Sequence, residues 1–293
     1  MALKLNSPCK INLLLNILGK RPDGFHELET VMHPIPLYDA IELARCPTGI
    51  RLSCSDATLP VDARNLVYRA ADTFLRVAGI TEGVEMHLEK RIPIAAGLGG
   101  GSGNAATTLL GLNQLFAFPA TEVQLVEIAT SLGSDVPFFL QNRPALATGR
   151  GEQIRSLEFF PALAGHYLLL VHPGFGISTP WAYQQLARYP NALHGRPGRA
   201  EKLISLLQNK DLSSAAEFFY NSLEASAMEK YPLLALFQEF FREAGATVAL
   251  MSGSGSATFA LMDGQKSAET VLEKFNNKFG AKFWTAIVPM SSN

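Results

Sequence analysis

The 293-residue chain has few of the features that mark secreted, membrane or nucleic-acid-binding proteins. Its three cysteines, Cys9, Cys46 and Cys54, are odd in number and lack CxxC spacing, which argues against a disulfide framework or a structural zinc site. No apolar run approaches the ~18 residues of a membrane-spanning helix, and the N-terminal segment lacks a signal-peptide cleavage site. The formal net charge of −1 provides no basic field for nucleic acid or an anionic membrane surface. We therefore expect a soluble, cytoplasmic protein whose partner is a small molecule.

Glycine, by contrast, reaches a high local density in one segment of the chain. The run Gly97-Leu-Gly-Gly-Gly-Ser-Gly-Asn104 follows a strand-like segment, 84–92, and precedes 104–116, which has helical spacing. Amides without intervening side chains, at a helix N-terminus, favour an anion, so we interpret the run as a phosphate-binding loop. It is neither a Walker A motif, because no Lys follows, nor the dinucleotide fingerprint, because Ser102 replaces its third Gly. A flexible turn is the alternative interpretation.

The rest of the first half predicts strands first and helices after. We expect strands over 3–6, 11–18, 26–34, 40–44 and 50–54, and helices over 65–77 and 122–132. A mixed sheet covered on one face by helices is the simplest fold for this order. The irregular chain between residues 144 and 161 suggests a boundary, which divides the chain into domains 1–155 and 156–293.

The second half predicts a β-α-β-β-α-β order with additional helices between residues 181 and 244. The expected strands are 166–171, 247–251, 258–262 and 283–288, with a helix over 265–279. This order is typical of a ferredoxin-like unit. The fold class is therefore α+β.

Two segments carry polar side chains with more than one interpretation. Lys10 and Asn12 are two residues apart on an apolar strand and so share a face, which either contacts solvent or lines a pocket. Asp135 precedes Pro137, so it is either the N-cap of a following helix or a carboxylate that orients or deprotonates a hydroxyl nucleophile.

Three loops carry further candidates. Phe25 and His26 at a turn could stack on a base and bond its polar edge, although a lone histidine is more commonly structural. Thr179 is a plausible N-cap, and Tyr183 in the same segment could simply pack. The sequence Ser252-Gly-Ser-Gly-Ser256 is either a second phosphate nest or a hairpin turn.

Together these motifs resemble those of the GHMP kinases, which phosphorylate small alcohols. The resemblance rests on three segments in order, 8–13, 93–102 and 252–256. The segments 21–26, 133–139 and 149–152 resemble the branch that acts on a cytidine-diphosphate-linked methylerythritol in non-mevalonate isoprenoid biosynthesis. This resemblance covers nearly the whole chain. It implies an N-terminal mixed sheet like ribosomal protein S5 domain 2, a C-terminal ferredoxin-like α/β sandwich, and a monomer or weak homodimer.

The resemblance also implies residue roles. The catalytic pair would be Lys10 and Asp135, and both would contact the substrate together with Asn12, Phe25, His26, Thr179 and Tyr183. ATP would contact Asn65, Leu66, Pro93, Ala95, Ala96, Gly97, Leu98, Gly99, Gly100, Gly101, Ser102, Gly103 and Asn104. The implied cofactors are ATP and Mg²⁺. Since we see no convincing carboxylate ligand, nucleotide and water would hold the metal.

Two residues depart from the family pattern. Gly103 stands where the family usually has a second Ser, and Phe25 where Tyr is frequent.

Two other functions stay open. One alternative is a kinase of another small alcohol, such as homoserine or mevalonate, for which a base pocket at Phe25, His26 and Tyr183 would have no purpose. The other is a non-catalytic nucleotide-binding protein, which predicts loss of the Lys10 and Asp135 pair.

Overall fold

The computed structural model describes residues 2–290, which form two compact units. Unit 1 comprises the chain up to Cys9, Leu37–Ile92 and Gly99–Asn142, and unit 2 comprises Lys10–Pro36, Pro93–Leu98 and Arg143–Asn293. The expected division at residue 155 stays a prediction about the order of the chain, whereas these units combine segments that are distant in sequence.

Two long strands, β1 (Leu3–Lys20) and β2 (His26–Cys46), contribute to both units. The prediction of four short strands in this region is therefore wrong. The strand predicted over 26–34 ends at Pro34, and Pro36 follows two residues later. Proline cannot donate to a ladder. In β2, however, residues 28–32 pair with one strand and 40–46 with another, so both prolines fall between these ladders. Neither ladder loses an N–H donor, and β2 runs on.

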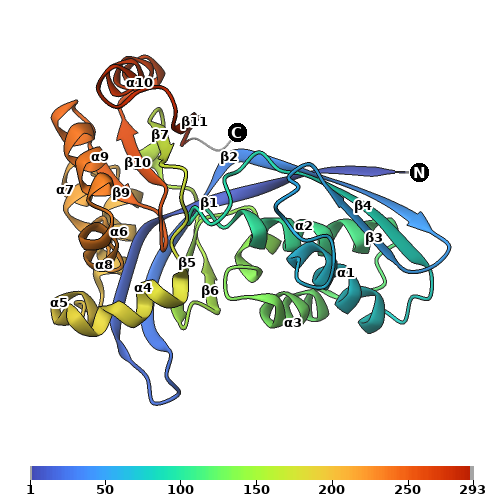
Figure 1. Ribbon diagram of the computed structural model, residues 1–293. Coiled ribbons are helices and arrows are strands. Elements are labelled where there is room, and N and C mark those ends of the chain that lie inside the picture. The colour runs from blue at the N-terminus through green and yellow to red at the C-terminus, as the bar shows by residue number, and fades with distance from the viewer. Residues whose placement is uncertain (1, 291–293) are drawn as a thin grey trace. The chain divides into compact units, whose positions relative to one another are not determined.

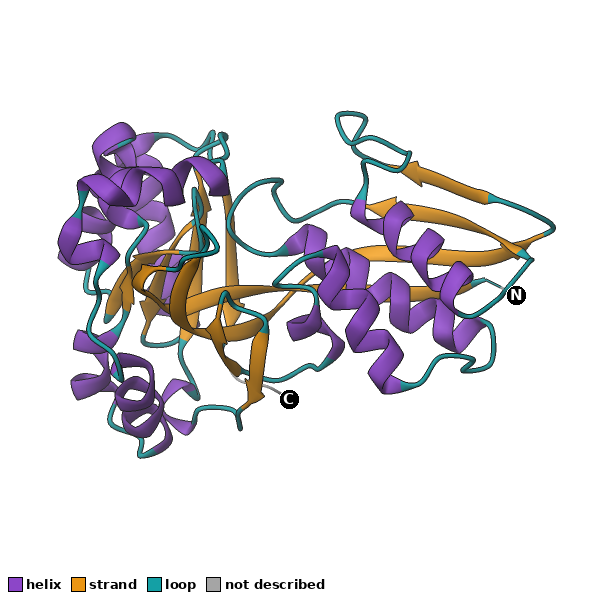
Figure 2. Cartoon of the chain, turned by 90° about the horizontal axis from the view of Figure 1, so that it is seen from below, coloured by secondary structure: helices purple, strands orange, loops and turns teal. Residues whose placement is uncertain are grey.

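Unit 1 is a sheet with three helices packed on it. β3 (Ile50–Cys54) pairs in parallel with β4 (Gly83–Glu89), and β4 pairs antiparallel with β2, in the order β3-β4-β2-β1. The helices are α1 (Leu66–Val77), α2 (Gly100–Leu115) and α3 (Glu122–Leu132). All three pack against one another beside the strands (Figure 2). The helix over 122–132 is confirmed at both ends, where Thr121 and Gln124 form a capping box.

Unit 2 contains a four-stranded antiparallel sheet in the order β11-β7-β10-β9. Its strands are β7 (Tyr167–His172), β9 (Val248–Met251), β10 (Thr258–Met262) and β11 (Trp284–Pro289). α9 (Pro232–Glu243) packs against β9 and β10, and α10 (Gln265–Phe279) against β7 and β11 (Figure 1). The expected ferredoxin-like order is confirmed. Phenylalanines from both helices fill the core, among them Phe237, Phe241 and Phe275.

The remaining elements of unit 2 extend the sheet of β1 and β2 or connect its strands. β5 (Ala145–Gly149) pairs with β2 and with β6 (Gln153–Ser156), and β8 (Tyr220–Asn221) pairs in parallel with β1. The connecting helices are α4 (Thr179–Gln185), α5 (Pro190–Leu193), α6 (Arg199–Gln208), α7 (Leu212–Ala215) and α8 (Glu224–Lys230). Within residues 2–290, every helix is too short or too polar to cross a bilayer. In this same part of the chain, none of the three cysteines forms a disulfide.

Candidate functional site

Helix α2 begins inside the glycine run, four residues before the predicted start. Gly99 is its N-cap in the left-handed region, with φ of 69°, and the N–H of Gly103 donates the first helical bond to the Gly99 carbonyl at 2.9 Å. No side chain caps the first turn, and that turn holds no acidic residue. The amides at the start of α2 therefore have neither a capping oxygen nor a local carboxylate. That arrangement suits an anion such as phosphate.

The segment before this helix belongs to unit 2 and is held by the hairpin loop 252–256. Gly97 has φ of 77°, and its carbonyl accepts a hydrogen bond from Ser252 Oγ at 2.9 Å. A Cβ at Gly97 would lie 2.0 Å from the Ser252 carbonyl oxygen, so only glycine fits. The Ala257 N–H also donates to the Ala96 carbonyl at 3.0 Å. The loop is thus the hairpin turn between β9 and β10, and its hydrogen bonds hold the backbone of 93–98 in place.

Lys10 and Asn12 are both buried, each with about 3% of its surface exposed, so the solvated-face interpretation is wrong. Lys10 Nζ donates to Asn12 Oδ1 at 2.6 Å and to the Gly97 carbonyl at 3.2 Å. Asn12 Nδ2 in turn donates to Thr30 Oγ1 at 2.8 Å. This chain of hydrogen bonds fixes the ammonium group of Lys10 beside the end of the 93–98 segment.

Unit 1 contains a buried ionic network that sequence analysis missed. The fully buried Asp39 accepts hydrogen bonds from the Arg91 N–H at 2.7 Å and the Ile92 N–H at 2.9 Å. Its other oxygen accepts from Asn104 Nδ2 at 2.9 Å and forms an ion pair with Lys90. The side chain of Asn104, expected at the phosphates, is thus engaged within the protein and anchors the first turn of α2. A signal was available, since Asp39 is the only acidic residue between Glu29 and Glu42.

Asp135 lies in unit 1, partly buried, in the turn before a 3₁₀ helix, Pro137–Leu140. Of the two interpretations of Asp135, the N-cap is wrong, because the cap residue is Val136 and no side chain bonds there. The 3₁₀ helix packs against α2 and α3, and Val136 and Phe138 are fully buried. Asp135 is therefore held beside apolar groups, in the unit that also contains α2.

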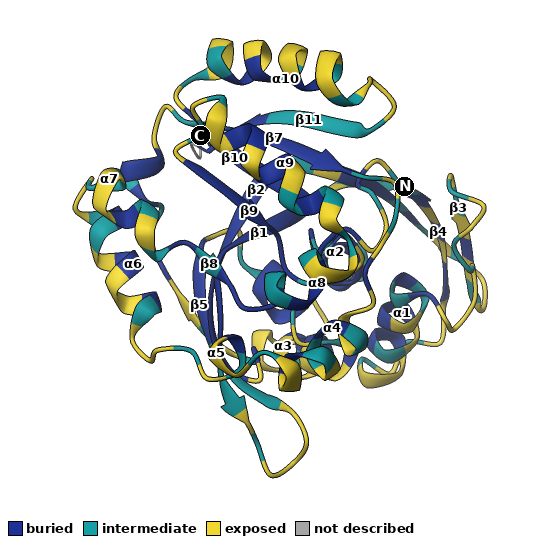
Figure 3. Ribbon diagram, turned by 60° about the vertical axis from the view of Figure 1, so that its left-hand side comes forward, coloured by how far each residue is buried: buried dark blue, intermediate teal, exposed yellow. Residues whose placement is uncertain are grey.

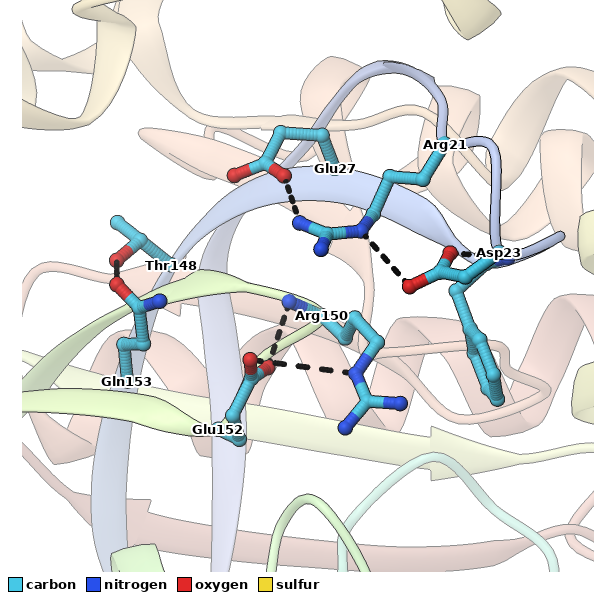
Figure 4. Close-up of polar contacts among 8 residues, drawn as sticks. Arg21, Asp23, Glu27, Thr148, Arg150, Glu152 and Gln153 are labelled. Atoms are coloured by element: carbon cyan, nitrogen blue, oxygen red, sulfur yellow. Dashed lines mark hydrogen bonds and ion pairs between the residues drawn. The ribbon is translucent and has the colours of Figure 1, made fainter.

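The turn between β1 and β2 presents Phe25, which is 55% exposed. Arg21 stabilises this turn through ion pairs with Asp23 at 3.2 Å and with Glu27 at 2.5 Å (Figure 4). The Phe25 N–H donates to Asp23 Oδ1 at 3.1 Å. The guanidinium of Arg150 lies 4.8 Å from the centroid of the Phe25 ring. One face of this exposed ring therefore contacts a cation.

The ring of His26, the next residue, packs against Tyr183, with centroids 5.1 Å apart and planes tilted by 44°. Burial, with a smaller contribution from the charge of Lys20, lowers the pKa of His26 below its usual value. The imidazole is thus neutral near pH 7 and can both donate and accept a hydrogen bond.

Helix α4 carries Thr179 and Tyr183 and begins one residue earlier than expected. The N-cap is Ser178, whose side chain accepts from the Trp181 N–H at 3.5 Å, so the N-cap role of Thr179 is wrong. Thr179 Oγ1 instead bonds Ser254 Oγ at 2.8 Å, which ties α4 to the hairpin loop 252–256.

The two residues expected near adenine lie at the start of α1. Asn65 is the N-cap: its Oδ1 accepts from the Val67 N–H at 2.9 Å, and its Nδ2 donates to the Pro60 carbonyl at 2.8 Å. Leu66 Cδ1 would lie 3.7 Å from a Cβ on Gly101, so its side chain borders the glycine run.

The expected site residues are therefore divided between the two units. Unit 1 holds Asn65, Leu66, Gly99, Gly100, Gly101, Ser102, Gly103, Asn104 and Asp135. Unit 2 holds Lys10, Asn12, Phe25, His26, Pro93, Ala95, Ala96, Gly97, Leu98, Thr179 and Tyr183. Within residues 2–290, no three His, Cys, Asp or Glu side chains gather in a way that could hold a metal ion.

Comparison with known proteins gives a consistent result over the whole chain. The family model for the GHMP kinases N terminal domain matches residues 65–143, and that for GHMP kinases C terminal matches residues 191–282. A relative from Geobacter sp. (strain M21), named 4-diphosphocytidyl-2-C-methyl-D-erythritol kinase, is 39% identical over 285 residues, which covers 95% of this chain and 97% of the relative.

Two solved structures extend the comparison. A crystal structure of 4-(cytidine 5'-diphospho)-2C-methyl-D-erythritol kinase has a TM-score of 0.81 and 33% identity, covering 98% of this chain and 99% of the other. A homoserine kinase from Cytophaga hutchinsonii has a TM-score of 0.77 at 20% identity, covering 98% and 94%. At that identity the second comparison shows the shared fold alone.

Proposed function

The chain belongs to the GHMP kinase family, and on that premise we propose that it transfers a phosphoryl group from ATP to the tertiary 2-hydroxyl of 4-diphosphocytidyl-2-C-methyl-D-erythritol. It is a small-molecule kinase, and the family implies ATP as the phosphate donor. The product is an intermediate of non-mevalonate isoprenoid biosynthesis, which we place in the cytoplasm.

The observation that carries this proposal is the uncapped start of α2. The glycine run supplies amides without side chains, and no carboxylate of the first turn competes for them. Phosphoryl transfer depends on positioning and on neutralising charge more than on covalent chemistry. A set of amides preorganised for an anion is what such a reaction needs from the donor site.

Lys10 and Asp135 have different roles at the substrate hydroxyl. The ammonium of Lys10, oriented by Asn12 and the Gly97 carbonyl, binds the substrate oxygen and offsets developing charge. Asp135 orients the hydroxyl or removes its proton. A buried lysine with fixed acceptors loses little conformational freedom when substrate binds, because its side chain is already ordered.

The aromatic groups of unit 2 account for base recognition. Phe25 and Tyr183 stack on the cytosine, and neutral His26 bonds its polar edge. Binding energy from the base, remote from the reacting hydroxyl, then fixes the orientation of the alcohol.

Mg²⁺ accompanies the nucleotide in this proposal. Since the described residues offer no cluster of metal-binding side chains, phosphate oxygens and water supply most of its ligands. Ser102 has the hydroxyl of the phosphate loop and makes no hydrogen bond to the protein within residues 2–290. It is the protein oxygen that we assign to the metal or to a phosphate.

The test is a comparison of acceptors. The protein is incubated with ATP and, in turn, the cytidylyl substrate, mevalonate and homoserine, and ADP formation is measured. We expect turnover with the cytidylyl compound alone; turnover with mevalonate or homoserine instead would contradict the substrate assignment.

A variant separates base recognition from catalysis. His26→Ala is expected to raise KM for the cytidylyl substrate at least about tenfold, since a hydrogen bond to the base and a ring contact are lost, with KM for ATP unchanged. His87→Ala, on strand β4 of unit 1, is the control. Equal KM values for His26→Ala and the control would remove His26 from the base site.

A further inference from the structure

Unit 2 contains a cavity of about 740 Å³ that no residue of the proposed active site lines. We call it the α6 cavity, because Arg199 and Lys202 of α6 line it together with Asn191 of α5 and Tyr220 of β8. These three elements are labelled in Figure 3. The lining side chains that bear on its chemistry are His194, Arg196, Arg199, Lys202, Glu217 and Tyr220. Three cations therefore line the cavity against one carboxylate.

Arg196 and Arg199 differ from most other arginines of unit 2, which form an ion pair with a carboxylate. Arg155 pairs with Glu201, and Arg188 with Glu229. Within residues 2–290, no carboxylate lies within ion-pair distance of Arg196, Arg199 or Lys202. The three positive charges that line the α6 cavity therefore exceed the single negative charge of Glu217.

Arg199 is held rigidly rather than extended into solvent. Its guanidinium lies 4.1 Å from the centroid of the Tyr220 ring, and it donates to the carbonyls of Phe218 at 3.2 Å and Glu217 at 3.1 Å. Burial lowers the pKa of Arg199 below its usual value; Tyr220 and Glu29 oppose this shift, and the neighbouring charge of Arg196 adds to it. An anion in the cavity would stabilise two guanidinium groups that repel each other.

The loop that contains Arg196 is hydrogen-bonded to strand β1. The Gly195 N–H donates to the Ile17 carbonyl at 2.7 Å, and Asn16 Nδ2 donates to the Arg196 carbonyl at 2.8 Å. The buried carboxylate of Glu29 accepts from the N–H groups of Gly198 and Ala200 at 3.2 and 3.1 Å. Glu29 thereby occupies the N-terminus of α6, so a ligand would be bound by the cationic side chains and not by the helix end.

We propose that the α6 cavity binds the diphosphate group of a small organic molecule, at a second site distinct from the phosphate loop. Arg196, Arg199 and Lys202 provide charge-assisted hydrogen bonds to the phosphate oxygens. The cavity is large enough for an organic group beside the diphosphate, and the aromatic rings of Phe218 and Tyr220 border that space.

Calorimetric titration with inorganic diphosphate tests the affinity, and hydrogen exchange of the segment 194–204 locates the binding. Arg196→Gln/Lys202→Gln removes two of the three cations. Lys266→Gln/Lys274→Gln, which changes two exposed lysines on α10, is the control with the same loss of charge. Circular dichroism of each variant shows that it is folded.

We expect diphosphate to slow exchange over 194–204 in the wild type and in the control. The Arg196→Gln/Lys202→Gln variant is expected to bind at this site at least about tenfold more weakly and to lose the protection, because two charge-assisted bonds are removed. Absence of protection in the wild type overturns the proposal, as does equal protection in the two double variants. No kinase assay enters this test, so its outcome is independent of the proposed function.

Discussion

The sequence resemblance leads us to expect a second serine at Gly103, and the structure gives a physical reason for glycine there. Gly103 lies in the first turns of α2, and a Cβ built on it would be 2.2 Å from the carbonyl oxygen of Pro8 in β1. Real Cβ atoms essentially never approach another atom closer than 3.0 Å. Because Pro8 O belongs to the backbone, a side chain at 103 can be accommodated only if α2 moves away from β1. We therefore expect Gly103→Ser to be harmful rather than to restore a missing hydroxyl.

The magnitude follows from two opposing effects. Overpacking against a backbone atom costs about 1–3 kcal/mol, and replacing a helical glycine recovers up to about 1 kcal/mol of backbone entropy. The difference is a net loss of up to about 3 kcal/mol in the free energy of unfolding, and we expect a value of about 1–2 kcal/mol because the contact is with a backbone atom. A displaced first turn of α2 would also raise KM for ATP, since the amides that hold the phosphates move with it.

Urea unfolding and steady-state kinetics measure both effects, with Gly101→Ser as the matched control. A Cβ at Gly101 would meet only Leu66 Cδ1, at 3.7 Å, which is ordinary contact. We expect the control to unfold within about 0.5 kcal/mol of the wild type. Gly103→Ser that is as stable as the wild type, or that has a lower KM for ATP, would refute the reasoning.

Two further predictions concern buried polar groups. Burial raises the pKa of Glu224 to about 7, so its contribution to stability is full below the unfolded value of 4.5 and is lost as pH rises through about 7. Glu224→Gln removes this pH dependence. Between about pH 5 and about pH 8.5 the free energy of unfolding of the wild type should fall by roughly 2–3 kcal/mol relative to that of the variant. The same pH dependence of unfolding in both proteins would contradict this prediction. Ser252→Ala removes the bond to the Gly97 carbonyl and should cost about 1–2 kcal/mol and raise KM for ATP, whereas Ser254→Ala, at a less buried position, should change both less. Equal effects of the two serine variants would show that loop 252–256 does not fix the backbone of 93–98.

Elements with a strong local pattern could be predicted from the sequence. The helices 122–132 and 265–279 and the strand 258–262 have clear apolar periodicity and well-marked ends, and all three are confirmed. The sequence predicts the start of α2 four residues late, because glycine has a low helix propensity and a run of glycines favours a loop. Here burial of the helix against the strands of unit 1 outweighs that propensity.

The side chains of the candidate site could be identified, but not their partners. The spacing of Lys10 and Asn12 fixed their common face, whereas their burial depends on Ser252 and Thr30, which lie far away in sequence. The network of Asp39 escaped prediction for the same reason, since its partners begin 51 residues later, at Lys90. Local periodicity contains no information about such long-range pairs.

Asp135 is the group that we propose to act on the substrate hydroxyl, so its substitution tests the kinase mechanism most directly. Turnover of ATP with 4-diphosphocytidyl-2-C-methyl-D-erythritol is measured for wild type, Asp135→Asn and, as a control, Asp263→Asn, which changes an exposed carboxylate at the end of β10. ATP affinity is measured separately for each. We predict that Asp135→Asn lowers kcat by a factor of about 10² to 10⁴ with ATP affinity unchanged, while the control keeps wild-type values. Wild-type turnover by Asp135→Asn would contradict the central claim.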